Sequence, residues 1–146
     1  MKYIKKFSKI LEQNDDFTNN YIEEVRNHIR DNDIEYFENN SIEDYEYNEF
    51  IVIATMYGRK EIVELLIDEG IDVNQTNNPS RTAAYYTDRY PDILEILLEN
   101  GLDIDKEDDW DETFFSVISD KTLNKLKDNK YLREYFKKKN VKKFKI

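Results

Sequence analysis

The chain has no cysteine, one histidine, three glycines and two prolines among its 146 residues. Without cysteine it can form neither a disulfide nor a thiolate metal site, and it has no thiol nucleophile. Three scattered glycines leave no glycine-rich loop to cradle a phosphate. The single histidine, His28, gives no paired ligands for a metal. We therefore expect no cofactor, no metal and no enzymatic activity.

Long apolar runs are also missing, and no segment reaches the roughly 20 apolar residues needed to cross a membrane. The N-terminal segment 1–11 is interrupted by Lys5, Lys6 and Lys9, so it lacks the apolar core of a secretory signal. Together with the absence of cysteine, this predicts a cytoplasmic protein.

Charge is abundant but unevenly distributed, with a net charge of −10. Residues 12–120 hold 30 acidic and 7 basic side chains, whereas residues 121–146 hold 2 acidic and 11 basic ones. An acidic body disfavours binding to a phosphate backbone and favours a basic partner, mainly through faster encounter. The alternative interpretation is that the acidity only keeps the protein soluble.

The most informative feature is an internal repeat. Residues 61–74 and 92–105 share one pattern at an offset of 31 residues, so that Gly70 aligns with Gly101 and Asp72 with Asp103. A period between about 20 and 50 residues indicates a stack of supersecondary units that seal one another's apolar faces. Such a stack functions by presenting one extended surface to a partner.

Each unit reads as two helices. Residues 49–57 are short and apolar, as expected of a buried inner helix, and Gly58 can supply the positive φ that ends it. Residues 61–69 place apolar side chains on one face and acidic ones on the other, as expected of an outer helix that ends at Gly70.

This order of turn, short helix, glycine, longer helix and Gly-x-Asp-Val-Asn resembles the ankyrin repeat, closely over residues 44–74 and less closely to 118. After this first full unit, a second unit opens at Asn77 and is two residues shorter, and a third opens at Asp108. The resemblance implies an all-α, ankyrin-like helical solenoid of about three to four helix-turn-helix units with divergent capping helices.

We expect one domain, 1–146. Residues 1–43 form an N-terminal cap helix and a divergent first unit, with helices near 21–29 and 33–38. The best repeats are 44–76 and 77–107, and residues 108–146 form a degenerate unit, a C-terminal cap and a basic tail. The apolar residues expected to seal the C-terminal end are Leu126, Tyr131, Leu132, Tyr135 and Phe136.

Two features have weak chemical interpretations. His28 lies between Arg26 and Arg30 on an expected helix, where a surface or partly packed role is favoured over catalysis. The segment 103–109 superficially resembles a calcium loop but lacks its central glycine and terminal glutamate, so a solvated acidic turn is expected instead.

The ankyrin resemblance places partner binding on the concave side, formed by turn tips and inner helices. Trp and Tyr among these positions fit a binding role, because both are enriched at interface hot spots. The alternatives are packing of Trp110 against the C-terminal cap and burial of Tyr45 and Tyr57 at repeat junctions. The candidate partner-binding residues are Tyr45, Glu46, Asn48, Met56, Tyr57, Asn78, Pro79, Arg81, Asp109, Trp110 and Glu112.

The basic tail leaves two interpretations open. It can contact an anionic membrane or a nucleic acid, or it can fold back and neutralise the acidic body. The lysines concerned are Lys137, Lys138, Lys139, Lys142, Lys143 and Lys145.

The predicted function is a non-catalytic protein–protein binding module with a basic protein partner and no small-molecule substrate. By analogy with small ankyrin-like proteins of bacterial toxin systems, an inhibitor or immunity-type protein that neutralises a toxin or nuclease is expected. The alternative is an adaptor that associates with a membrane or nucleic acid through the lysine tail.

Overall fold

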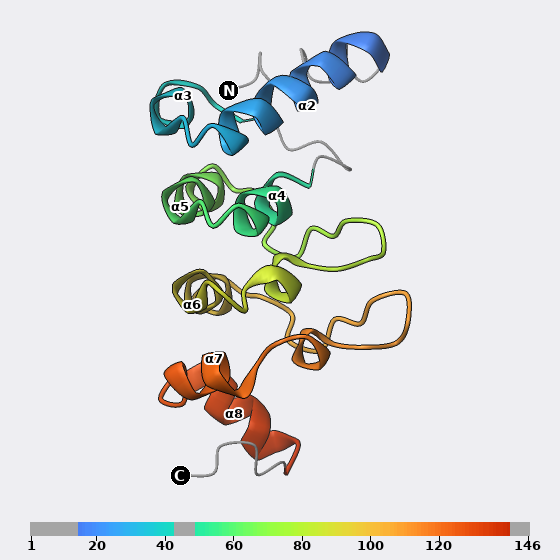
Figure 1. The fold of residues 1–146 in the computed structure, drawn as a ribbon, viewed down its shortest axis with the longest axis vertical. Helices are drawn as coiled ribbons and strands as arrows, with labels where there is room; N and C mark the ends of the chain where they lie inside the picture. Colours follow the sequence, from blue (N-terminus) through green and yellow to red (C-terminus); the bar gives the residue numbers. More distant parts are fainter. Residues whose placement is uncertain (1–14, 43–48, 141–146) are drawn as a thin grey trace.

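The computed structural model describes residues 15–42 and 49–140. Within these residues, seven α-helices and two 3₁₀ helices are stacked in layers (Figure 1), which confirms the all-α helical-repeat prediction. The elements are α2 (Asp15–Arg30), α3 (Ile34–Asn39), α4 (Phe50–Met56), α5 (Lys60–Asp68), η1 (Ala83–Tyr86), α6 (Pro91–Glu99), η2 (Phe114–Ser116), α7 (Asp120–Lys125) and α8 (Lys130–Lys138).

Each layer pairs an inner with an outer element. The inner elements α2, α4, η1 and η2 contact one another in that order, and the outer helices α3, α5, α6 and α7 form a parallel column. Helix α8 lies beyond α7 at the C-terminal end of the stack (Figure 1). Two loops, residues 74–82 and 105–113, project from the side opposite the outer helices.

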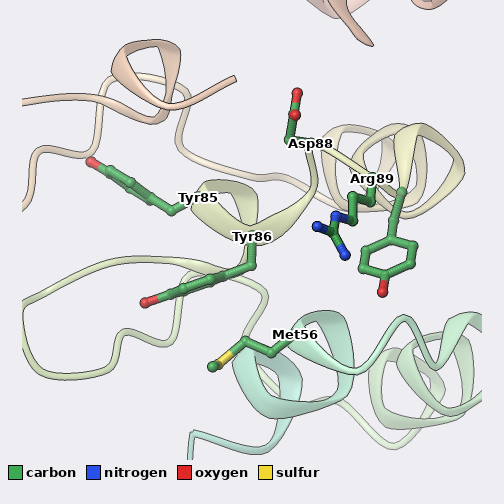
Figure 2. A pocket seen from close by; sticks show the side chains of 6 residues that line it. Met56, Tyr85, Tyr86, Asp88 and Arg89 are labelled. Atoms are coloured by element: carbon green, nitrogen blue, oxygen red, sulfur yellow. The ribbon is translucent and has the colours of Figure 1, made fainter. Parts of the chain in front are cut away.

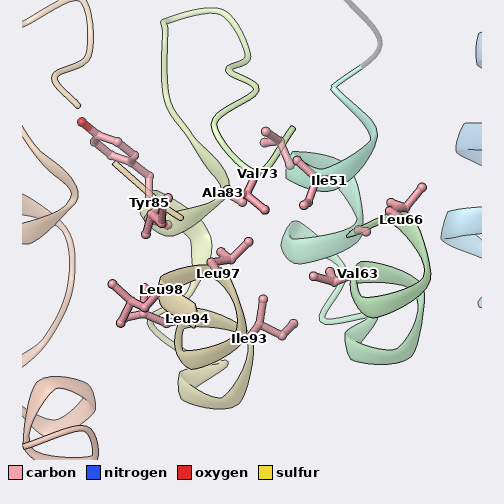
Figure 3. Packing of buried hydrophobic residues seen from close by; sticks show 14 of the residues in the cluster. Ile51, Val63, Leu66, Val73, Ala83, Tyr85, Ile93, Leu94, Leu97 and Leu98 are labelled. Atoms are coloured by element: carbon pink, nitrogen blue, oxygen red, sulfur yellow. The ribbon is translucent and has the colours of Figure 1, made fainter. Parts of the chain in front are cut away.

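The outer helices show why the two copies of the repeat look alike. Ile62, Val63 and Leu66 of α5 are fully buried, and their counterparts 31 residues on, Ile93, Leu94 and Leu97 of α6, are buried to within 1%. Val63 and Ile93 lie between the two outer helices (Figure 3). Burying each such side chain contributes roughly 1.5–3 kcal/mol, so the shared pattern is the pattern of the inter-layer core.

The inner elements become shorter along the stack, from 16 residues in α2 to 7, 4 and 3 in α4, η1 and η2. The prediction of a short inner helix is thus confirmed for α4, but the second and third units make only a single 3₁₀ turn. The cause is chain length. The N-cap residues of the inner and outer helices, Glu49 and Arg59, are ten positions apart in the first full unit. The corresponding residues are eight positions apart in the second unit, Thr82 and Tyr90, and six apart in the third, Thr113 and Ser119.

The divergent ends of the repeat array are helical as well. Val25 and Ile29 of α2 and Phe37 of α3 are buried, as the expected first unit requires. In the third unit, Leu123 and Leu126 are buried at α7, which is a short outer helix. The expected N-terminal cap helix lies outside the described residues.

At the C-terminal end, α8 buries Leu132 and Phe136 almost completely, and Tyr131 and Tyr135 are partly buried against the same core. The Phe136 ring lies 5.2 Å from that of Phe115 in the third unit. Together with the buried Leu126, the residues expected at the C-terminal cap thus lie in or against the core.

A side-chain ladder joins the links between layers. The Asn74 carboxamide donates to the Gly101 carbonyl at 3.0 Å and accepts from the Asp103 N–H at 2.7 Å. The residue 31 positions on is Asp105, whose carboxylate accepts from the Tyr135 hydroxyl at 3.0 Å and pairs with the Lys139 ammonium at 3.2 Å. The same position of the repeat therefore has two different partners: Asn74 bonds to the following repeat, and Asp105 bonds to the C-terminal region of helix α8.

Candidate protein-binding surface

Two loops of similar build form the projecting part of the surface. We call residues 74–82 the first finger and residues 105–113 the second finger. Asn77 closes the first finger, since its side-chain oxygen accepts from the Arg81 N–H at 3.2 Å. Asp108 closes the second in the same way, accepting from the Glu112 N–H at 3.2 Å. Both turns contain a residue with a left-handed backbone conformation, Ser80 in the first finger and Asp111 in the second.

An ion pair connects the two fingers. The Arg81 Nε donates to Asp108 Oδ2 at 2.9 Å, and the Asp109 N–H donates to the Pro79 carbonyl at 3.2 Å. The Asp108 side chain is fully buried in this pair. Burial alone would raise the pKa of Asp108, but hydrogen bonds from the Trp110 and Glu112 N–H groups and from Arg81 outweigh it, so the pKa is lowered. The carboxylate is thus held in its charged form.

Beneath the fingers, Tyr85 supports this arrangement. Its single O–H is shared between the carbonyls of Lys106, at 2.9 Å, and of Glu112. Burial raises the pKa of Tyr85 to about 12, so the hydroxyl remains a donor at neutral pH. The Arg81 guanidinium lies 5.2 Å from the ring centroids of both Tyr85 and Trp110, a cation–π geometry that joins the buried ring to the exposed one.

Trp110 itself is 62% exposed, the largest exposed fraction among the large apolar side chains of the described residues. This exposure excludes the alternative that Trp110 packs against the C-terminal cap. We define the tryptophan patch as Trp110, its partner Arg81 and the exposed acidic residues around it, namely Glu107, Asp109, Asp111 and Glu112. The patch combines a large apolar face with carboxylates on a braced loop.

A second feature lies at the C-terminal end of the inner elements. Because η1 is shorter than α4, the last turn of α4 is uncovered, and Met56 and Tyr57 are 49% and 44% exposed. Below them is an open hollow of about 300 Å³ between α4 and the segment that joins η1 to α6 (Figure 2). Its lining residues are Met56, Tyr85, Tyr86, Asp88, Arg89 and Tyr90. Tyr85 thus belongs both to this hollow and to the support of the fingers.

Within the hollow, the two charged residues differ in their partners. The Asp88 carboxylate accepts from the Ser119 N–H at 2.7 Å, and hydrogen bonds from Ser119 lower the pKa of Asp88. The exposed Arg89 guanidinium also lowers the pKa of Asp88 by its charge, but among the described residues it has no hydrogen bond and no ion pair. The other arginines near this end are engaged: Arg59 donates to the Arg30 carbonyl at 2.6 Å, and Arg30 donates to Asn27 at 2.9 Å.

The acidic charge is concentrated in two regions. One is the second finger. The other is the solvent face of the outer column α3, α5 and α6, where Lys60 is the one exposed basic residue and the exposed acidic residues are Glu35, Glu38, Glu61, Glu64, Asp68, Asp92, Glu95 and Glu99. The inner surface expected to be acidic is therefore acidic at the second finger, whereas its hollow carries one charge of each sign, on Asp88 and Arg89.

The structure places the predicted binding residues in two neighbouring groups. Pro79, Arg81, Asp109, Trp110 and Glu112 come together across the two fingers, and Asn78 is exposed beside Pro79. Met56 and Tyr57 lie at the end of α4, and the exposure of Tyr57 excludes its ordinary burial at a repeat junction. The remaining candidates, Tyr45, Glu46 and Asn48, lie outside the described residues.

Sequence reasoning missed Asp108, Tyr85 and Tyr86, and it left Asp88 and Arg89 unassigned. For Asp108 a signal existed, since it lies 31 positions after Asn77 and repeats its hydrogen-bonding role. For the hollow residues none existed, because the two-residue deletion removed the register by which the ankyrin pattern assigns them.

The lysines of the C-terminal region have different environments. Lys137 and Lys138 are exposed on α8, whereas Lys139 pairs with Asp105 of the acidic body. The fold-back interpretation therefore holds for Lys139. Lys142, Lys143 and Lys145 lie outside the described residues.

The other features considered from sequence have structural roles. His28 is half-buried, stacks on Tyr36 with centroids 3.7 Å apart and bonds Asp33 at 2.9 Å, in agreement with a partly packed side chain. In the segment 103–109, the carboxylates of Asp103, Asp105 and Asp108 accept hydrogen bonds from backbone or side-chain donors. Among the described helices, none is both long and apolar enough to traverse a bilayer.

Comparison with known proteins gives a clear result at the level of the family. A family model described as ankyrin repeats (3 copies) matches residues 15–108, from the start of α2 through the second unit into the second finger. No curated protein matches the chain. The matched region covers more than half of the chain and coincides with the stacked layers, so this protein belongs to the ankyrin-repeat family.

Proposed function

We propose that the chain is a non-catalytic inhibitor or immunity-type protein that neutralises a basic protein partner, such as a toxin or nuclease, through the tryptophan patch. Ankyrin repeats are protein-interaction modules, and the finer proposal rests on this chain's own surface. The carrying observation is Trp110, 62% exposed and braced by Arg81, which is itself anchored on the buried Asp108.

This bracing matters for affinity. Binding loses free energy whenever a flexible side chain must be ordered, by roughly 0.5–1.5 kcal/mol for each side chain. Trp110 already has its ring against the Arg81 guanidinium and its backbone N–H bonded to Asp108 at 2.9 Å. A partner that covers the ring therefore meets a side chain whose position is largely set.

The charge around Trp110 supports a basic partner. Glu107, Asp109, Asp111 and Glu112 are exposed and lie on the same loop as Trp110. The net charge of −10 adds a long-range field that accelerates encounter with a cationic protein. The inhibitor role itself draws on the analogy with bacterial toxin systems, as does the expectation of a cytoplasmic location.

The test compares three baits in affinity purification: the natural chain, Trp110→Phe and Trp110→Ala. A partner held by the patch should bind the Phe variant and should lose on the order of 2 kcal/mol, about 30-fold in Kd, with the Ala variant. Raising salt from 50 to 500 mM should weaken the complex, since the Debye length falls well below 10 Å. Partners that bind the Ala variant equally well, with a salt-independent Kd, would refute the proposal. Thermal melts should show that both variants keep the fold.

The alternative function, an adaptor for a membrane or nucleic acid, has one supporting observation. Helix α8 buries Leu132 and Phe136 and exposes a row of basic residues, namely Lys130, Arg133, Lys137 and Lys138. Deleting α8 cannot test this function, because it would also remove the seal on the core. Lys137→Gln together with Lys138→Gln keeps the seal. Loss of binding to anionic vesicles or RNA, with retained protein partner, would favour the adaptor.

A further inference from the structure

The hollow between α4 and η1 has a chemistry of its own that the tryptophan patch does not share. Its lining includes Met56, Tyr86, Asp88 and Tyr90. The Arg89 guanidinium points toward the Tyr86 ring (Figure 2). A volume of about 300 Å³ equals that of roughly ten water molecules, enough for one large side chain and a neighbouring polar group.

We propose that this hollow binds an extended segment of a protein partner in which a large apolar side chain stands next to an aspartate or glutamate. The apolar side chain covers Met56, and the carboxylate pairs with Arg89. This inference rests on the proposed protein-binding function and adds a second contact with a different chemistry.

The first argument is steric. The inner elements η1 and η2 of the two layers that follow are shorter than α4, because the chain between the N-cap residues of their inner and outer helices is shorter by two and four residues. The last turn of α4 therefore has no counterpart below it, and Met56 remains 49% exposed. Methionine is flexible and polarizable, and such side chains adapt to apolar partners of varied shape.

The second argument is charge complementarity. The Asp88 carboxylate accepts from the Ser119 N–H and cannot be displaced without breaking this bond to the N-cap residue of α7. Arg59 and Arg81 are bonded within the stack. Arg89 interacts electrostatically with the neighbouring Asp88 but makes no hydrogen bond or ion pair to any described residue, so its guanidinium N–H groups remain available to a carboxylate, the partner they match best. A cationic occupant would face this guanidinium at close range.

The test uses three capped peptides that differ at two positions: Ac-Gly-Ser-Leu-Glu-Ser-Gly-NH₂ and the same sequence with Leu-Gln or Ser-Glu at the centre. The chain has two methionines, Met1 and Met56, so ¹³C-methyl labelling of methionine gives one reporter in the hollow and one outside it. The Leu-Glu peptide should shift the Met56 methyl resonance in a saturable way and leave that of Met1 in place.

The Leu-Gln peptide should bind roughly two- to fivefold more weakly, the size expected for an exposed ion pair. This preference runs against the net charge of the chain, which repels the glutamate peptide. Arg89→Gln should remove the preference, whereas the matched exposed variant Arg133→Gln should keep it. Equal binding of Leu-Glu and Leu-Gln, persistence of the preference in Arg89→Gln, or no Met56 shift up to about 10 mM peptide overturns the inference.

The two proposals fail separately. Trp110→Ala should leave peptide binding in the hollow unchanged, because its side chain does not line it. A partner whose binding falls with Trp110→Ala but not with Arg89→Gln would leave the proposed function standing and refute the role of the hollow. Peptides that bind as expected, with no partner sensitive to Trp110, would refute the proposed function and support the hollow.

Discussion

Replacing Gly58 by alanine tests how closely two layers of the stack meet. Gly58 follows α4 with φ +66°, a left-handed conformation, and a Cβ built on it would lie 2.4 Å from Cε1 and 2.6 Å from Cζ of the Tyr90 ring. Gly70 follows α5 with φ +89°, and its Cβ would meet nothing within 4 Å. The two glycines therefore share the backbone requirement, and only Gly58 has the close approach.

The magnitudes follow from this difference. A left-handed alanine costs about 1–2 kcal/mol, so Gly70→Ala should destabilise by that amount. Gly58→Ala adds the displacement of a partly buried tyrosine ring, for which overpacking costs about 1–3 kcal/mol. At roughly 2–4 °C per kcal/mol for a chain of this size, Tm should be about 2–12 °C lower for Gly58→Ala than for Gly70→Ala.

Urea unfolding and thermal melts followed by circular dichroism measure both variants. Adding Tyr90→Ala should relieve the clash, so the double-mutant cycle between positions 58 and 90 should give a coupling of about 1–3 kcal/mol. If the two glycine variants differ by less than about 0.5 kcal/mol, or if the cycle shows no coupling, then the contact between Gly58 and Tyr90 does not set the layer spacing.

Three further predictions concern the contacts between layers. Asn74→Ala removes two hydrogen bonds and should cost about 1–3 kcal/mol in urea unfolding, whereas Asn39→Ala, which loses one exposed bond within its own helix, should cost less than about 1 kcal/mol. The pKa of Asp108 is lowered in the folded state, so the stability that its charge contributes is complete above the unfolded pKa of about 4 and is lost as the pH falls further. Asp108→Asn should therefore flatten the acid side of a plot of unfolding free energy against pH. An unchanged acid side would contradict a stabilising charge on Asp108. Asp105→Asn removes the exposed pair with Lys139 and should change stability by less than about 1 kcal/mol, a loss that disappears in 0.5 M salt.

The helical-repeat architecture could be predicted from the sequence because the residues that repeat are the buried apolar ones. Leu66 and Leu97 are buried at equivalent places in consecutive outer helices, and the same core position requires the same apolar pattern. The ends of helices were also readable, as Gly58 confirms with its positive φ. Short helices with mixed composition, such as α7, gave no periodic signal, and only tertiary packing of Leu123 shows that it belongs to the stack.

The binding surface was less accessible. Trp110 was recognised as a candidate from its residue type, but the ion pair that positions it joins Arg81 to Asp108 across 27 residues. The hollow depends on how many residues connect Thr82 to Tyr90, a length that changes the helix type and with it the exposure of Met56 in the preceding layer. Neither effect appears in the local pattern of apolar and polar residues.

The change from Asn74 to Asp105 along the side-chain ladder marks where the stack of repeats ends. A carboxamide offers a donor and an acceptor, so it can grip the link of a following layer, whereas a carboxylate only accepts and instead attracts the Tyr135 hydroxyl and Lys139. A lengthened version of this protein would therefore need an asparagine at every internal rung and an aspartate only at the last, beside the terminal helix. The amide nitrogen of Asn74, replaced by a carboxylate oxygen in Asp105, thus distinguishes a layer that bonds to a following repeat from the last layer of the stack.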